Sequence, residues 1–169
     1  MGRRDRKNPR DIVASVSRLH HPRGSNRDVM GEKKQKLTGI TFILVRPNSE
    51  MLLQLRDEKS RYYPNTWCFP GESAEGNEEP IQMVIRGVQE EYNVRVSKNI
   101  CQFLTVNHLP HINQEIAVFI CKIDDNQTPV MREGKKMRWM GINEIKKLEL
   151  GFEQNKILPF IEEFLRGSQ

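Results

Sequence analysis

The chain has few cysteines, which argues against a disulfide framework, and no long hydrophobic run, which argues against a membrane-spanning helix. Its 169 residues include three cysteines, at positions 68, 101 and 121. They are odd in number, widely spaced and without zinc-site spacing, so we expect reduced thiols in a cytoplasmic chain rather than a disulfide framework. No stretch approaches the roughly 18 consecutive apolar residues of a membrane-spanning helix. We therefore expect no membrane partner.

The N-terminal residues lack the apolar segment of a secretory signal and are strongly basic. Residues 1–36 hold eleven Lys or Arg against four Asp or Glu, a local charge of +7 in a chain whose net charge is +5. The basicity therefore belongs to this segment, and the remainder is slightly acidic. We expect a basic arm at 1–36 and one folded domain at 37–169.

Two interpretations of the arm stay open. Its early cations, Arg3, Arg4, Arg6, Lys7 and Arg10, favour contact with RNA or phosphate. No aromatic residues alternate with them to stack on bases, which favours a solvated tail or an arm that packs on its own domain or on a protein partner, such as a second copy in a homodimer.

Residues 37–169 alternate between strand and helix patterns. Leu37–Arg46 is a nearly continuous apolar run, typical of a strand buried on both faces, and a turn joins it to a second strand at 51–56. Further strand patterns lie at 94–101, 103–107, 115–123 and 137–141. Helical spacing begins at Pro80, at Ile142 and over 155–165. Strands with helices on both sides predict an α/β/α sandwich.

The stretch from Tyr63 to Val96 organises the chain: YPNTWCFPGESAEGNEEPIQMVIRGVQEEYNVRV. Proline is well tolerated in the first turn of a helix, so Pro80 can open one. Apolar residues then recur at helical spacing and predict a buried stripe, while Arg86, Glu90 and Glu91 are expected together on the opposite side. Adjacent carboxylates are costly without a cation between them, and hard oxygen ligands favour a divalent metal.

This stretch resembles the Nudix box, G-x5-E-x7-R-E-U-x-E-E-x-G-U, in which U is apolar. Gly71 lies just before the box, and the matching positions are Glu78, Arg86, Val88, Glu90, Glu91 and Val94. Three positions depart from it: Glu72 replaces the first glycine, Gly87 the glutamate after the arginine, and Asn93 the last glycine. The resemblance covers roughly Leu37 to Leu165.

The resemblance implies a mixed sheet between helices and Mg²⁺-dependent hydrolysis of the diphosphate linkage of a nucleoside diphosphate derivative, as in nucleotide-sanitising relatives; Mn²⁺ is an alternative ion. It implies that Glu90 and Glu91 bind the metal, with a backbone carbonyl near Gly71 or Glu72. By the same resemblance, Glu78 and Arg86 form a structural pair that orients the glutamates.

The missing glutamate at Gly87 leaves two functions open. In the family that glutamate is a metal ligand or general base, and general acid–base help is worth about 10²–10⁴-fold. We hypothesise that Glu72 or Glu133 takes over part of its role, Glu133 lying six residues before Trp139. The alternative is a weak or inactive Nudix domain that binds RNA, nucleotides or a ribonucleoprotein partner.

Three further residues are candidates for substrate binding. Lys59 and Arg61 precede an aromatic cluster and could meet phosphates, although an exposed loop explains them equally well. Asn155 stands where relatives acting on oxidised purine nucleotides carry a base-reading asparagine, but asparagine is also a common helix cap. Cys68 has no neighbouring histidine in sequence, and we expect it to be inert.

Overall fold

A computed structural model of the chain describes residues 37–168. The expectations for the arm at 1–36 lie outside the described residues. Within 37–168 the strands form one seven-stranded sheet with the central order β3-β2-β1-β6-β5, to which β4 adds beside β1 and β7 beside β2. The strands are β1 (Gly39–Val45), β2 (Met51–Leu55), β3 (Trp67–Cys68), β4 (Gly71–Ser73), β5 (Cys101–Leu109), β6 (Gln114–Lys122) and β7 (Lys136–Met140).

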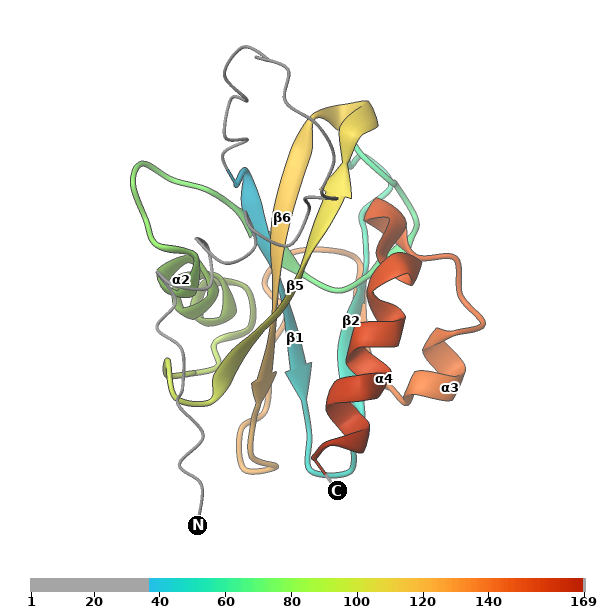
Figure 1. The fold of residues 1–169 in the computed structure, drawn as a ribbon. Coiled ribbons are helices and arrows are strands. Elements are labelled where there is room, and N and C mark those ends of the chain that lie inside the picture. Colours follow the sequence, from blue (N-terminus) through green and yellow to red (C-terminus); the bar gives the residue numbers. More distant parts are fainter. Residues whose placement is uncertain (1–36, 169) are drawn as a thin grey trace, which may run out of the picture. The chain divides into compact units, whose positions relative to one another are not determined.

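Helices cover both faces of this sheet. Helix α2 (Pro80–Tyr92) lies on one face, and α3 (Ile142–Ile145) and α4 (Leu158–Arg166) lie on the other (Figure 1). Two short 3₁₀ segments, η1 (Pro110–Ile112) and η2 (Gly151–Ile157), complete the described chain. The pairing of β1 with β6 is parallel and its pairing with β2 antiparallel, so the sheet is mixed. The predicted α/β/α sandwich is confirmed.

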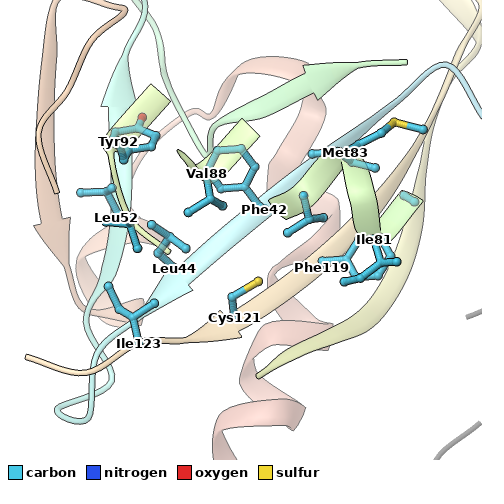
Figure 2. Packing of buried hydrophobic residues seen from close by; sticks show 14 residues of the cluster. Phe42, Leu44, Leu52, Ile81, Met83, Val88, Tyr92, Phe119, Cys121 and Ile123 are labelled. Atoms are coloured by element: carbon cyan, nitrogen blue, oxygen red, sulfur yellow. The ribbon is translucent and has the colours of Figure 1, made fainter. Parts of the chain in front are cut away.

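Strand β1 is buried along its whole length, as its apolar run predicts. Because successive side chains of a strand point to opposite faces, Phe42 and Leu44 pack in the core under α2, whereas Ile43 and Val45 pack in the core under α4. Figure 2 shows the first core, in which Phe42 lies against Val88 and Tyr92 of α2.

The two ends of α2 follow from local chemistry. Pro80 occupies the first turn, and the Gln82 side chain accepts a hydrogen bond from the Glu79 backbone N–H at 3.0 Å. At the other end Asn93 adopts a left-handed conformation, with φ of 54°, and its N–H donates to the Gln89 carbonyl. Glycine is the usual residue at such a helix end, and asparagine is the commonest substitute, so this departure from the box is conformationally conservative.

Two predicted elements differ in the structure. Residues 94–97 form no strand, because the segment runs beside the 127–130 loop, where the Arg95 N–H donates to the Gln127 side chain at 3.0 Å; β5 begins only at Cys101. The last α-helix begins at Leu158 rather than Asn155. Pro159 has no N–H to donate and is tolerated only in a first turn, so the preceding residues form a 3₁₀ segment instead.

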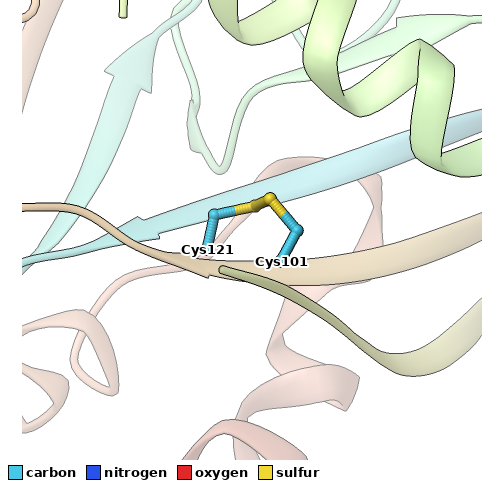
Figure 3. The surroundings of a disulfide bond; sticks show 2 residues. All are labelled: Cys101 and Cys121. Atoms are coloured by element: carbon cyan, nitrogen blue, oxygen red, sulfur yellow. A yellow bond between two sulfur atoms is a disulfide. The ribbon is translucent and has the colours of Figure 1, made fainter. Parts of the chain in front are cut away.

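The cysteine prediction was wrong for two of the three residues. Cys101 of β5 and Cys121 of β6 are direct partners in the antiparallel register and form a disulfide (Figure 3). Their Cα atoms are 4.1 Å apart, which is the close spacing of directly opposite residues in such a pair. The third cysteine, Cys68, is free and buried. The cytoplasmic expectation, which rested partly on reduced thiols, stays a prediction.

Among the described residues, no helix is both long and apolar enough to cross a membrane.

Replacing Asn93 by alanine should lower the free energy of unfolding by about 1–2 kcal/mol, because alanine is strained in the left-handed region and lacks the polar side chain that makes this region accessible to asparagine. Urea unfolding of Asn93→Ala and Asn93→Gly separates this cause from the lost side-chain hydrogen bonds. Glycine should cost clearly less than alanine. Equal losses would show that the backbone conformation is not the reason.

The disulfide predicts a thiol count. Protein purified without reductant and then denatured should react with one equivalent of a thiol reagent, from Cys68, and with three after reduction. Cys68→Ser should leave none before reduction. Three reactive thiols in the unreduced wild type would contradict the Cys101–Cys121 pairing.

Candidate active site

A cleft of about 230 Å³ opens where β1, β4, the end of β2 and η2 meet. Its walls are formed by polar and apolar residues: Thr38, Gly39, Ile40, Thr41, Gln54, Arg56, Tyr62, Cys68, Phe69, Gly71, Glu72, Ser73, Gln114, Ile116, Phe152 and Gln154. The backbone at Gly71 packs tightly here, because a Cβ on this residue would lie 2.3 Å from the Ile40 carbonyl oxygen. The glycine is therefore required by the strand pairing that forms the cleft wall.

Beside this cleft, Arg86 of α2 contacts both β4 and the acidic loop that joins β4 to α2 (residues 74–79). Its guanidinium donates two hydrogen bonds of 3.0 Å to the Glu78 carboxylate. It also contacts Glu72 at 3.4 Å, Glu90 at 3.2 Å and the Ser73 carbonyl at 3.3 Å. The bond from Arg86 holds the pKa of Glu78 below its usual range. Arg86 and Glu78 are therefore paired directly, and their role in orienting the glutamates stays a prediction.

Glu91 is buried, with 6% of its surface exposed, and does not share the solvent side of α2 as the sequence predicted. Burial raises its pKa to about 9, and the charge of Glu72, a hydrogen bond with that carboxylate and the charge of Glu133 act in the same direction. Arg56 is the positive charge that opposes these effects.

The other predicted carboxylates lie nearer to solvent. The Glu90 side chain is 59% exposed and turns toward Arg86. Glu133 is exposed in the loop before β7, and its charge reaches the buried Glu91 carboxyl. The structure thus brings Glu72, Glu90, Glu91 and Glu133 to one region, in which Glu91 interacts electrostatically with Glu72 and Glu133.

The predicted substrate-binding residues lie away from the cleft walls, and their role stays a prediction. Lys59 and Arg61 are exposed in the loop after β2, where Arg61 stacks on the Tyr62 ring with its guanidinium carbon 5.1 Å from the ring centre. Asn155 uses both ends of its amide on the backbone: it accepts from the Leu150 N–H and donates to the Leu148 carbonyl, each at 2.8 Å. This favours the structural interpretation of Asn155.

Gly71 and Glu72 line the cleft as predicted site residues, but sequence reasoning missed others that line it, among them Arg56 and Phe152. Arg56 packs over the Phe152 ring, with its guanidinium carbon 4.9 Å from the ring centre, and Tyr63 lies against the same ring at 4.8 Å between centres. Phe152 is held in a left-handed conformation, with φ of 55°, while its carbonyl accepts a 2.8 Å hydrogen bond from Asn107. A cation and an aromatic ring therefore meet at the cleft wall. The sequence did not indicate that Arg56 and Phe152 meet, because they lie in segments that are far apart along the chain.

Cys68 borders the cleft but is not an activated nucleophile. Burial raises the pKa of its thiol to about 11, so the thiol keeps its proton at neutral pH. The expectation of an inert thiol agrees with this environment.

The donor chemistry of the site fits a hard divalent cation. No group of three or more His, Cys, Asp or Glu side chains is arranged as a metal cluster among residues 37–168. The buried Glu91 carboxyl and the partly buried Glu72 carboxyl are nevertheless two interacting oxygen donors, and a metal ion between them would relieve their repulsion. Glu90, one residue from Glu91, is the nearby carboxylate that could join them.

Comparisons with known proteins agree with this geometry. The family model for the NUDIX domain matches residues 36–161. No curated protein sequence matches the chain. Several solved structures share the fold. The MutT protein from Methanosarcina mazei Go1 superposes with a TM-score of 0.63 at 18% identity, over 79% of this chain and 95% of that one.

Two further structures come from nucleotide-related proteins. A C. elegans Ap4A hydrolase in a binary complex has a TM-score of 0.61 at 18% identity, over 76% of this chain and 98% of that chain. The NUDIX domain of Shewanella oneidensis NrtR, complexed with ADP ribose, has a TM-score of 0.63 at 15% identity, over 90% and 97%. The family model spans most of the chain, and the sheet and box helix have the expected arrangement; the chain belongs to the Nudix domain family.

Proposed function

We propose that this protein is a Mg²⁺-dependent hydrolase that cleaves the diphosphate linkage of a nucleoside diphosphate derivative. The observation that carries the proposal is the interaction of the buried Glu91 carboxyl with Glu72, which lies on the wall of a cleft that also holds Arg56. Family membership and the likeness to an Ap4A hydrolase and to an ADP-ribose complex support a nucleotide substrate.

Glu91, Glu90 and Glu72 would hold the metal ion. When bound, the ion supplies charge neutralisation at the phosphates and a more acidic water molecule. Mn²⁺ presents similar hard-ligand chemistry and is expected to substitute.

The protein's own residues then position the reactants. Arg86 fixes Glu78 and Glu90 through direct hydrogen bonds, so the carboxylates need not reorganise when substrate arrives. Arg56 points a fixed positive charge toward the cleft in which a diphosphate would lie, and its guanidinium stays aligned through Phe152 and a 2.8 Å bond to the Tyr62 carbonyl. The Phe152 ring offers an apolar surface for a base.

Purified protein with Mg²⁺ or Mn²⁺ should hydrolyse at least one member of a panel of nucleoside di- and triphosphates, nucleotide sugars, dinucleoside polyphosphates and capped RNA. Glu91→Gln should lower kcat/KM by roughly 100-fold or more, the scale on which a catalytic carboxylate acts. Glu163→Gln, an exposed change on α4, is the matched control and should keep full activity. Absence of turnover across the panel would reject the hydrolase.

A second candidate function is supported by the charge of the arm. The +7 charge of residues 1–36, together with the missing box glutamate at Gly87, favours a binding module for RNA or a ribonucleoprotein partner with little hydrolysis.

Deleting residues 1–36 separates the two candidates. If the binding module is correct, the wild type should bind single-stranded RNA with an affinity that falls steeply with salt, and the deletion should abolish that binding. The measurement is a filter-binding titration at two or more salt concentrations. Equal affinity with and without the arm would reject the module.

A further inference from the structure

Gly87 is a glycine because Glu72 occupies the space beside it. A Cβ built on Gly87 would lie 2.5 Å from the Glu72 Cγ and 3.1 Å from the Phe42 Cε1. Phe42 is fully buried between β1 and α2 and cannot give way (Figure 2). A side chain at position 87 would therefore have to displace the Glu72 side chain.

The Glu72 carboxylate ends beside the site's carboxylates. Glu72 lies in β4 opposite Ile40, in regular strand pairing. Its side chain reaches α2, where it lies beside Gly87 and its carboxylate contacts the Arg86 guanidinium at 3.4 Å. Residues four apart on a helix are neighbours, so a glutamate at 87 would present its carboxylate to Glu91 from the same side.

The two departures from the box are thus reciprocal. The pattern has glycine where this chain has Glu72, and glutamate where this chain has Gly87. Each change accounts for the other, since the strand supplies the carboxylate and the helix leaves room for it. A loss of the helix glutamate alone would have left a void beside Phe42.

We propose that Glu72 is a metal-binding residue of the site and supplies, from β4, the carboxylate that the box otherwise places on the helix at position 87. This inference rests on the proposed function, because it assigns a residue to the same metal site. It predicts that residues 72 and 87 can be exchanged only together.

Glu75 is a control residue that distinguishes a metal-binding role of Glu72 from a purely structural one, because both glutamates contact Arg86. Glu75 also faces Arg86, at 3.7 Å, but its side chain is 71% exposed, whereas that of Glu72 is 21% exposed and lies against Gly87. If Glu72 served only as a counter-charge for Arg86, Glu72→Gln and Glu75→Gln would have similar small effects.

The first experiment measures Mn²⁺ affinity by calorimetry, together with kcat/KM, for wild type, Glu72→Gln and Glu75→Gln. We expect Glu72→Gln to weaken Mn²⁺ binding at least about 10- to 100-fold, the range found when groups around a metal are lost. The melting temperature should stay near that of wild type because glutamine keeps the side-chain volume. Glu75→Gln should bind Mn²⁺ like the wild type.

The second experiment exchanges the two residues. Gly87→Glu alone should lower the melting temperature, because its Cβ meets Glu72. Glu72→Gly alone should fold but bind Mn²⁺ weakly. The double variant Glu72→Gly/Gly87→Glu, which restores the box pattern, should recover both melting temperature and Mn²⁺ affinity relative to the single variants. A double variant no better than either single would overturn the exchange.

The outcomes also separate this inference from the proposed function. If the wild type binds Mn²⁺ and turns over substrate while Glu72→Gln does both equally well, the hydrolase stands and the role of Glu72 is rejected. If the wild type neither binds Mn²⁺ nor hydrolyses any substrate, the hydrolase fails and the inference fails with it. The calorimetric readout needs no substrate, and Glu72→Gln remains decisive if Gly87→Glu does not fold.

Discussion

One guanidinium holds the acidic side of this molecule together. Arg86 reaches the acidic loop through Glu78, the strand β4 through the Ser73 carbonyl, and its own helix through Glu90. Carboxylates brought this close to one another repel unless a cation lies between them. Because the Arg86 side chain is only 18% exposed, water screens its charge little, and the network fixes the position of α2 relative to β4. The cleft and the buried Glu91 both depend on that relative position.

Patterns local in the sequence predicted most of the fold. The apolar run before Arg46 indicated a strand buried on two faces, and the spacing after Pro80 indicated an amphipathic helix; both are present. These predictions succeed because strand and helix periods follow directly from backbone geometry. The resemblance to the box predicted that Glu78 pairs with Arg86, eight residues later, and the two side chains are hydrogen-bonded in the structure.

Features that depend on contacts between distant segments could not be predicted. Glu91 follows Val84 by seven residues and lies within about 20° of it at 100° per residue, so the helical period itself places Glu91 on the buried side and the prediction of a solvent position was wrong. Its neighbour Glu72 on β4 could not be predicted from that period. Cys101 and Cys121 pair because the β5–β6 register places them opposite each other, which cysteine spacing alone does not reveal. The position of the Phe152 ring at the cleft likewise depends on a left-handed backbone conformation, which the local sequence does not predict.

The parallel pairing of β1 with β6 constrains how the chain reaches this state. Gly39 pairs with Ile116 and Val45 with Lys122, so the two central strands are joined by a long connection that holds β4, the acidic loop and α2. To bring strands this far apart in sequence together, the chain must lose loop-closure entropy before the stabilising contacts between them form, and this slows folding. During synthesis, the acidic network and its helix leave the ribosome before β6 does. The inner edge of β1 thus has no strand partner until β6 emerges, and nascent chains at that stage expose an edge on which others can pair.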